Sequence, residues 1–278
     1  MNNQRTHYVT TTDGVTIGGT VHGEGPPLVF LQGLIGDGDL DWAQVVEHLS
    51  GRFTCHLPSM RGRGLSGDHP DLRTSRIAAD YVTYVDSIGE PVGLTGWSGG
   101  ASQALAVVAQ SDMVAAVAPW EPVAASTFDE QAQAAVGGAL ARTGELAAEG
   151  NLTAAVRAFA GFPFTDAEVS VAEDAGYLEG AARYVPHLLN LFQQMFAEDE
   201  PPVIDDPAAL GAISAPVLVL TGSDTKAFFK TSAQHVVEHT PKARTQEIPG
   251  VGHAAPLTHP KVLADALAEF FSRTRQHA

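Results

Sequence analysis

The stretch 91-PVGLTGWSGGASQALAVVAQ-110 decides the fold that this sequence predicts. Residues 91–96 form an apolar run typical of a strand, and residues 101–110 have the composition of a helix. Only residues 97–100, with three small side chains among four, separate the two. The stretch therefore predicts a strand, a sharp turn and a helix in immediate succession.

The turn matches the pattern G-x-S-x-G, which is typical of a nucleophile elbow. Glycine at positions 96 and 100 lets the strand and helix backbones approach without a clashing Cβ, and the turn raises the hydroxyl of Ser98 clear of the backbone. The helix that follows directs unpaired N–H groups at the same point, where an anion on a substrate oxygen would be stabilised. Because five residues can match by chance, a glycine-rich loop before a core helix is the alternative, and the flanking segments have to decide.

Before this stretch, strand-like and helix-like segments alternate. Residues 6–22 hold two β-rich runs around the turn dipeptide Asp13-Gly14, which favours an antiparallel hairpin. The run PLVFL at 27–31 has the continuous apolar character of a strand buried on both faces. The alternation continues with a helix at 41–50, a strand at 52–57, a helix at 75–88 and, after the elbow, a strand at 113–120. It predicts an α/β fold with a mostly parallel sheet flanked by helices and a ligand site at the carboxyl ends of the strands.

The alternation stops at about residue 122 and resumes after residue 206. In between lie Ala-rich helical segments at 126–150, 152–162 and 179–200, with no strand pattern. We therefore expect a core domain formed by residues 1–121 and 207–278, and a helical cap or lid at 122–206, inserted after the sixth strand, whose Phe, Tyr, Leu and Met side chains line a pocket. The core then resumes with a strand at 215–222, a helix to 239, a strand at 244–250 and a last helix to about 273.

Composition excludes several classes of function. With 16 basic and 32 acidic residues the formal charge is −16, which disfavours nucleic acids and anionic membranes as partners.

No window approaches 18 uninterrupted apolar residues, and the first ten residues hold no secretory signal, so we expect a cytoplasmic protein. The single cysteine, Cys55, lies in an apolar run and is expected to be a buried thiol. The oligomeric state is left open, a homo-oligomer included.

Four features together resemble the α/β-hydrolase superfamily over nearly the whole chain. They are PLVFL followed by QGL at 32–34, SMRGRGLS at 59–66, which is similar to D-x-R-G-x-G-x-S, GWSGG at 96–100, and PGVGHAAP at 249–256, which is similar to the loop with the C-terminal histidine. The chain departs from the family at Gln32 and Ser59, where many members have His and Asp. The resemblance implies an α/β-hydrolase fold, and these departures concern its loops more than its chemistry.

In this family a serine nucleophile is activated by a histidine, which an acid orients. The resemblance assigns Ser98 as the nucleophile and His253 as the general base and then general acid. Most members carry the acid three residues after the glycine that ends the strand at 215–222, but this position is Thr225 here. Glu121, directly after the strand at 113–120, is the favoured acid, since haloalkane dehalogenases and zearalenone lactonases place a glutamate there. Asp224 is the alternative.

The expected oxyanion hole consists of backbone N–H groups. The donors are Gly99, which follows the nucleophile, and Leu34 after the first buried strand, while Gly33 gives room for the turn. Because these donors are backbone groups, Gln32 need not abolish them. A serine nucleophile also argues against haloalkane dehalogenase and epoxide hydrolase chemistry, which in this fold needs a carboxylate.

The sequence thus predicts a hydrolase that needs no cofactor and no metal and that cleaves a small to medium hydrophobic carboxylic ester or lactone through an acyl-enzyme on Ser98. A C–C bond hydrolase, a perhydrolase or haloperoxidase-like enzyme, and a non-catalytic ligand-binding member of the fold are the alternatives. The segment 235-HVVEH-239 matches the zinc pattern H-x-x-E-H, but a helix on the outside of the sheet with no clear third ligand argues against a metal site there.

Overall fold

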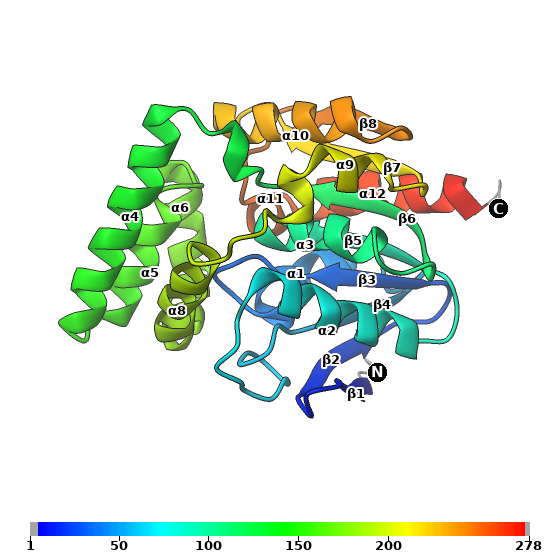
Figure 1. Ribbon diagram of the computed structural model, residues 1–278, viewed down its shortest axis with the longest axis horizontal. Helices are drawn as coiled ribbons and strands as arrows, with labels where there is room; N and C mark the ends of the chain where they lie inside the picture. Colours follow the sequence, from blue (N-terminus) through cyan, green and yellow to red (C-terminus); the bar gives the residue numbers. More distant parts are fainter. Residues whose placement is uncertain (1–4, 276–278) are drawn as a thin grey trace.

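The computed structural model describes residues 5–275 and contains one eight-stranded sheet flanked by helices (Figure 1). The strand order is β1-β2-β4-β3-β5-β6-β7-β8. The strands are β1 (Arg5–Thr10), β2 (Thr16–His22), β3 (Pro27–Leu31), β4 (Thr54–Pro58), β5 (Val92–Trp97), β6 (Val114–Trp120), β7 (Val217–Gly222) and β8 (Ala243–Ile248).

The strand pairing confirms the predicted mixture of one hairpin and a parallel sheet. β1 and β2 pair antiparallel around the predicted turn, where Gly14 has a φ of 86°, a value that glycine adopts without strain. β2 is also antiparallel to β4, and the strands from β4 to β8 are mutually parallel. All carboxyl ends of these parallel strands therefore meet at one edge of the sheet.

Two hydrophobic cores lie on the two faces of the sheet. Along β3, Leu28 and Phe30 belong to the first core and Val29 and Leu31 to the second, because successive side chains of a strand point to opposite faces. This explains why the strand reads as a continuous apolar run. Helices α1 (Gly38–Glu47), α11 (Ala255–Thr258) and α12 (Pro260–Arg275) cover the first core, and α2 (Thr74–Ser87), α3 (Gly99–Val108), α9 (Pro207–Gly211) and α10 (Ala227–His239) cover the second.

Helices α4 to α8, which we call the cap, lie between β6 and β7 in the chain. Figure 1 shows them together on the left, at the end toward which β3 points. The first core continues into them through apolar residues such as Val156, Phe159 and Leu188. The cap comprises α4 (Glu130–Ala148), α5 (Leu152–Ala160), α6 (Asp166–Asp174), α7 (Tyr177–Ala181) and α8 (Val185–Met195), with short 3-10 helices at Ala125–Thr127, Ala182–Tyr184 and Val203–Asp205.

Helix α6 is absent from the sequence prediction. It begins at a capping box, in which the Thr165 side chain accepts from the Glu168 N–H and the Glu168 carboxylate accepts from the Thr165 N–H. The T-x-x-E spacing was the available signal, but a helix of nine residues with a weak apolar stripe does not reveal itself by periodicity.

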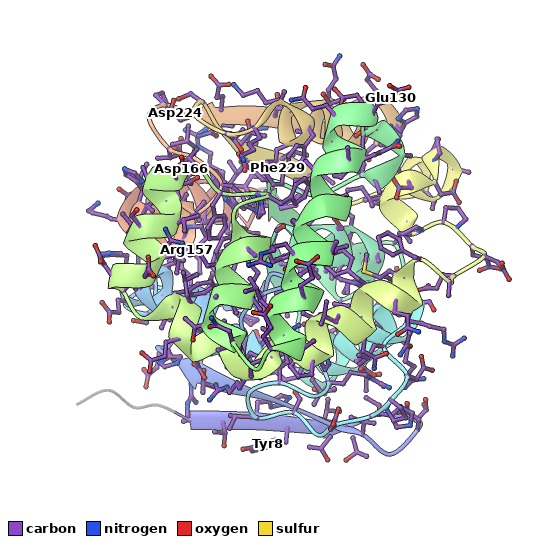
Figure 2. All side chains as sticks on the ribbon, turned by 90° about the vertical axis from the view of Figure 1, so that its left-hand side faces the viewer. Tyr8, Glu130, Arg157, Asp166, Asp224 and Phe229 are labelled. Atoms are coloured by element: carbon purple, nitrogen blue, oxygen red, sulfur yellow. The ribbon has the colours of Figure 1, made fainter. Side chains whose placement is uncertain are left out.

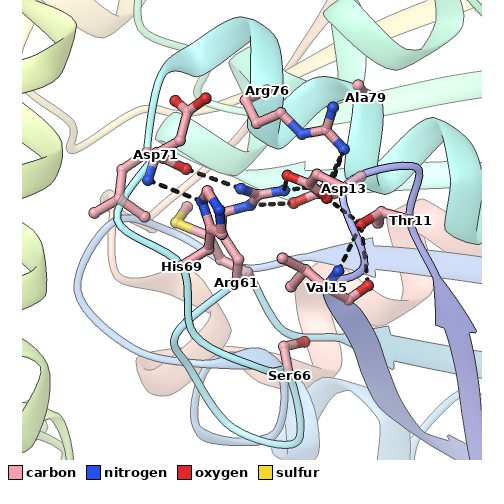
Figure 3. A network of polar contacts seen from close by, with 12 residues as sticks. Thr11, Asp13, Val15, Arg61, Ser66, His69, Asp71, Arg76 and Ala79 are labelled. Atoms are coloured by element: carbon pink, nitrogen blue, oxygen red, sulfur yellow. Dashed lines mark hydrogen bonds and ion pairs between the residues drawn. The ribbon is translucent and has the colours of Figure 1, made fainter.

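A buried arginine fixes the loop that follows β4 (Figure 3). Arg61 is fully buried and forms a bidentate pair with Asp80 on α2, with N–O distances of 2.6 and 2.8 Å. It also bonds Asp13 in the β1–β2 turn at 3.0 Å, and Arg76 reaches the same aspartate at 3.0 Å. The loop that carries both Arg61 and Arg63 is thereby joined to the β1–β2 turn and to α2.

Cys55 is buried in β4 as a free thiol, as the sequence predicts. Within residues 5–275, no helix is both long and apolar enough to cross a lipid bilayer.

Candidate active site

Ser98 stands alone between a strand and a helix, at the turn that the sequence predicts. β5 ends at Trp97, α3 begins at Gly99, and Ser98 has φ 58° and ψ −120°, a conformation that non-glycine residues rarely adopt. A Cβ at position 96 would collide with the carbonyl of Gly100, and one at position 100 with the carbonyl of Gln32. Both glycines of the pattern are therefore sterically required, and the strained residue between them faces a cavity.

His253 and Glu121 form a buried pair at the carboxyl ends of the strands. The Nδ1 of His253 lies 2.7 Å from Oε2 of Glu121, and both side chains are almost completely buried. Like Ser98, Glu121 has a positive φ, 47°, directly after β6. The His253 ring stacks on Phe229 of α10 at 3.9 Å, and its carbonyl accepts from the Trp120 indole. The imidazole is thus held at its ring face, at its backbone and at Nδ1, which leaves Nε2 for another partner.

The two candidate acids, Glu121 and Asp224, differ in burial: Glu121 is buried and Asp224 is exposed. The Glu121 carboxylate accepts from the N–H of Gly222 at 2.8 Å and from the hydroxyl of Thr225 at 2.8 Å, in addition to His253. Thr225, which stands where most of the family carries its acid, therefore contacts the acid instead of supplying it. Asp224 is exposed and accepts from Ser223; in Figure 2 it lies at the periphery, whereas Phe229 lies in the interior. The structure brings Glu121 to His253 and leaves Asp224 away from it.

Ser98 and His253 line the same cavity, but the described residues show no hydrogen bond between the serine hydroxyl and the imidazole. Catalytic hydrogen bonds are often long in ligand-free sites and tighten when a substrate binds. The arrangement can therefore pass a proton from Ser98 to His253 once a substrate orders the hydroxyl.

The two expected oxyanion donors are neighbours in space. A Cβ at Gly99 would lie 2.5 Å from the Leu34 side chain, so the residue after the nucleophile packs directly against the loop after β3. Gly99 is the first residue of α3, where a backbone N–H has no partner within the helix. The N–H of Leu34 likewise meets no acceptor among residues 5–275. Two N–H groups are thus available at the cavity wall beside Ser98.

The structure does not support the expected role of Gly33, which was to give room for the turn at the oxyanion hole. Its N–H donates to Asp41 at 2.6 Å and is not available to a substrate. A Cβ at this position would make only ordinary contacts, the nearest at 3.4 Å, so room for the turn is not what requires glycine here. The crowded glycine of the loop is Gly36, where a Cβ would collide with the Asp41 carboxylate.

Gln32 and Ser59, the two departures from the family pattern, both bind backbone groups. The Gln32 amide donates to the Gly36 carbonyl at 2.6 Å and accepts from the Met60 N–H at 2.7 Å, which joins the loops after β3 and β4. The Ser59 hydroxyl accepts from the Gly38 N–H at the start of α1 at 3.2 Å. These residues keep the loops of the site in place, so they give no reason to expect a disabled site.

The cavity has a volume of about 590 Å³ and lies between the sheet edge and the cap. Among the described residues no lysine or arginine lines it; the ionisable residues on its wall are His253, Tyr177 and three acids, Glu198, Glu200 and Asp205. Its walls are largely apolar and include the aromatic side chains of Trp97, Phe128, Phe159, Phe162, Phe164, Tyr177, Phe192, Phe196 and Phe229. Such a lining suits an uncharged, apolar ligand.

Two cap residues that sequence reasoning missed contact the loops of the site. The Glu168 carboxylate of α6 accepts from the N–H of Ala254, directly after His253, at 2.7 Å. The Tyr177 hydroxyl of α7 donates to Asp41 at 2.9 Å. Both contacts join segments more than 80 residues apart in the sequence, so no local pattern announces them.

The two histidines and the glutamate of the H-x-x-E-H pattern on α10 make contacts of other kinds. The rings of His235 and His239 bond the backbone carbonyls of Ile204 and His235, at 3.0 and 2.8 Å, and Glu238 accepts from Gln234. In the described part of the chain, no group of three or more His, Cys, Asp or Glu residues is arranged to hold a metal ion.

Comparisons with known proteins agree with this architecture. The sequence model of the alpha/beta hydrolase family matches residues 21–266. An alpha/beta hydrolase from Sphaerobacter thermophilus is 27% identical, with a TM-score of 0.72 over 95% of this chain and 100% of that chain. Two further structures share the fold. A thermophilic esterase from Thermogutta terrifontis is 20% identical, with a TM-score of 0.77 over 97% of this chain and 99% of that chain. A 2-hydroxy-6-oxo-6-phenylhexa-2,4-dienoate hydrolase from Rhodococcus is 19% identical, with a TM-score of 0.75 over 98% of this chain and 100% of that chain. No curated protein matches. The chain therefore belongs to the alpha/beta hydrolase family.

Proposed function

We propose that the protein is a serine hydrolase that cleaves an uncharged, hydrophobic carboxylic ester or lactone. The observation that carries this proposal is the buried Glu121–His253 pair at 2.7 Å, whose histidine lines one apolar cavity together with the strained Ser98. A strained nucleophile position, an oriented imidazole and two available N–H groups are the components that acyl transfer needs.

In the proposed acylation, His253 accepts the proton of the Ser98 hydroxyl as its oxygen attacks the substrate carbonyl carbon. The negative charge that develops on the carbonyl oxygen is stabilised by the N–H groups of Gly99 and Leu34. Glu121 holds the Nδ1–H tautomer and stabilises the imidazolium. His253 then donates its proton to the leaving alkoxide, which departs as the alcohol and leaves an acyl group on Ser98.

In deacylation, His253 activates a water molecule that attacks the acyl carbon by the same steps. The serine is regenerated and the carboxylic acid is released. For a lactone, acid and alcohol are parts of one molecule, so a single hydroxy acid leaves the cavity. The acids on the cavity wall, Glu198, Glu200 and Asp205, repel this anionic product.

The cavity wall favours an uncharged substrate over the dienoate for which one structural neighbour is named. A dienoate carries a carboxylate, whose burial without a cationic partner is costly. No described lysine or arginine lines the cavity to supply that partner. This argument ranks ester and lactone hydrolysis above C–C bond hydrolysis of a carboxylate substrate. The contacts of Gln32, Ser59 and Glu121 also favour a catalytic over a non-catalytic member of the fold.

The test compares the wild type with Ser98→Ala on p-nitrophenyl esters of increasing acyl length, on aryl lactones, and on matched esters that carry a second, free carboxylate. We expect turnover of the neutral compounds, at least tenfold lower kcat/KM for the carboxylate-bearing ones, and no activity in the variant. A fluorophosphonate probe should label Ser98 in the wild type only. Absence of both turnover and labelling would contradict the proposal, and a preference for the anionic esters would contradict its substrate class.

A further inference from the structure

The carboxylate of Asp41 lies directly beneath the loop that carries the oxyanion donor Leu34. Asp41 belongs to α1 and is 1% exposed. Its Oδ2 accepts the Gly33 N–H at 2.6 Å, and its Oδ1 accepts the Tyr177 hydroxyl at 2.9 Å. One carboxylate therefore joins the backbone of the oxyanion loop to helix α7 of the cap.

The same loop is held from its other side by Arg63. The guanidinium NH1 donates to the carbonyls of Leu34 and Gly36, both at 2.8 Å, and the side chain is 1% exposed. The N–H of Gly33 and the carbonyl of Leu34 thus flank the Leu34 N–H, and each has a buried charged partner. The N–H between them meets no acceptor among residues 5–275. Fixing both neighbouring groups fixes the direction of the N–H that remains available.

Tyr177 makes this arrangement depend on the cap. It is the first residue of α7, it is buried, and its ring lies 6.2 Å from that of Trp97 at the elbow. The ring also lines the cavity. A displacement of α7 from the sheet would therefore remove one of the two hydrogen bonds that orient the Asp41 carboxylate.

Holding a carboxylate here is costly, which argues that the loop needs it. Burial is the main cause that raises the pKa of Asp41 to about 7, and Asp37 at the start of α1 adds to the rise. The Gly33 N–H, the Tyr177 hydroxyl and the Arg63 guanidinium act in the opposite direction. Tyr81 of α2 also faces this group. A neutral side chain at this position would give a more stable fold. Ionisable groups that are kept at such a cost to stability are concentrated at functional sites.

We propose that Asp41 is a positioning residue, which orients the Gly33–Leu34 peptide so that the Leu34 N–H stabilises the oxyanion, and that Tyr177 makes this orientation dependent on the seated cap. The inference rests on the proposed acyl-transfer function. It assigns to the cap a part in assembling the catalytic groups, in addition to lining the cavity.

The test uses Asp41→Ala, Asp41→Asn and Tyr177→Phe, with Asp39→Asn as the matched control. Asp39 lies on the same helix, but its carboxylate contacts Thr20 instead of the oxyanion loop. For each variant, kcat and KM are measured on a neutral p-nitrophenyl ester. The inhibition constant of an aryl boronic acid is also measured, since its tetrahedral adduct with Ser98 resembles the transition state.

We expect Asp41→Ala to lower kcat on the order of 100-fold, because a misplaced donor costs about this much. KM should stay within about threefold, since the apolar wall that binds the ground state is unchanged. The boronic acid should bind more weakly by the factor that kcat/KM loses. Asp41→Asn should stay within about tenfold of the wild type, because its amide oxygen can still accept from Gly33. Tyr177→Phe should lower kcat about tenfold, as expected for one hydrogen bond to a charged group.

The inference is overturned if Tyr177→Phe and Asp41→Ala keep kcat and boronic acid affinity within about threefold of the Asp39→Asn control. It is also overturned if the variants raise KM as much as they lower kcat, because that pattern indicates a changed cavity shape. If Asp41→Ala does not fold, Tyr177→Phe decides by the same criteria. Failure of the proposed function is distinguishable, since there the wild type itself shows no turnover and no labelling of Ser98.

Discussion

Replacement of Glu121 by glutamine tests the proposed mechanism at its most specific contact. The carboxylate accepts three hydrogen bonds, from the Gly222 N–H, the Thr225 hydroxyl and the His253 Nδ1–H. A glutamine that keeps its oxygen on the Gly222 N–H presents its NH₂ group to the other two partners. The threonine hydroxyl can rotate and accept, but His253 can accept at Nδ1 only in the tautomer that carries its proton on Nε2.

That tautomer cannot take the proton of Ser98. The same kind of exchange in a Ser-His-Asp triad lowers kcat by about 10⁴, which corresponds to about 5.5 kcal/mol of transition-state stabilisation. We therefore expect Glu121→Gln to lower kcat by about 10⁴ with little change in KM, because Glu121 itself does not line the cavity. The assay is initial-rate hydrolysis of a neutral p-nitrophenyl ester, and thermal unfolding verifies that the variant is folded.

Asp224→Asn is the matched control, since it makes the same carboxylate-to-amide change at an exposed position whose side chain contacts Ser223. Its kcat should remain within about twofold of the wild type. Retention of more than about a tenth of the activity in Glu121→Gln would refute the tautomer argument. A large loss in Asp224→Asn with an active Glu121→Gln would transfer the acid to Asp224.

Three further predictions concern the buried charges around the site. Arg61→Met should lower the free energy of unfolding in urea by about 3 to 5 kcal/mol, because it removes the bidentate partner of the buried Asp80 carboxylate and leaves only the 3.5 Å contact with Arg76. A loss under about 1 kcal/mol would contradict this, and Arg61→Met combined with Asp80→Leu should recover stability. Burial raises the pKa of Asp41 from 3.8 to about 7, so the folded state keeps the proton to higher pH than the unfolded state does. The free energy of unfolding of the wild type should therefore fall by up to about 4 kcal/mol as the pH rises from about 4 to about 7. Asp41→Asn lacks this loss, so its melting temperature relative to the wild type should rise from pH 5 to pH 8, and a constant difference would contradict the assignment. Glu168→Ala should lower kcat about tenfold, because the Ala254 N–H beside His253 loses its acceptor. Glu168→Gln retains an acceptor oxygen and should remain near the wild-type rate. Equal rates in the two variants would show that the contact does not matter for turnover.

Residues of the cap contribute to the candidate site in two ways, by lining the cavity and by making polar contacts with the groups around it. Its aromatic side chains line the cavity and bear on which substrates fit. Its polar contacts, from Glu168 to the loop with His253 and from Tyr177 to the oxyanion loop through Asp41, bear on the geometry of the reacting groups. If the proposed mechanism holds, we expect a change in the cap to alter kcat without altering the cavity wall.

The sequence by itself determined the parts of the protein that local physics encodes. The hairpin around Asp13 and Gly14, the continuous apolar run of β3 and the glycines on either side of Ser98 each follow from the conformations that a few neighbouring residues allow. Local rules also placed Glu121 and Asp224 just after strands, and therefore at the correct edge of the sheet.

The tertiary structure decided what depends on direction and on distant partners. Both acids follow a strand, but only the positive φ of Glu121 and its donors at Gly222 and Thr225 bring its carboxylate to His253. Tyr177 meets Asp41 across 136 residues. Such contacts depend on how whole helices pack, and packing is a collective property that no single stretch of sequence contains.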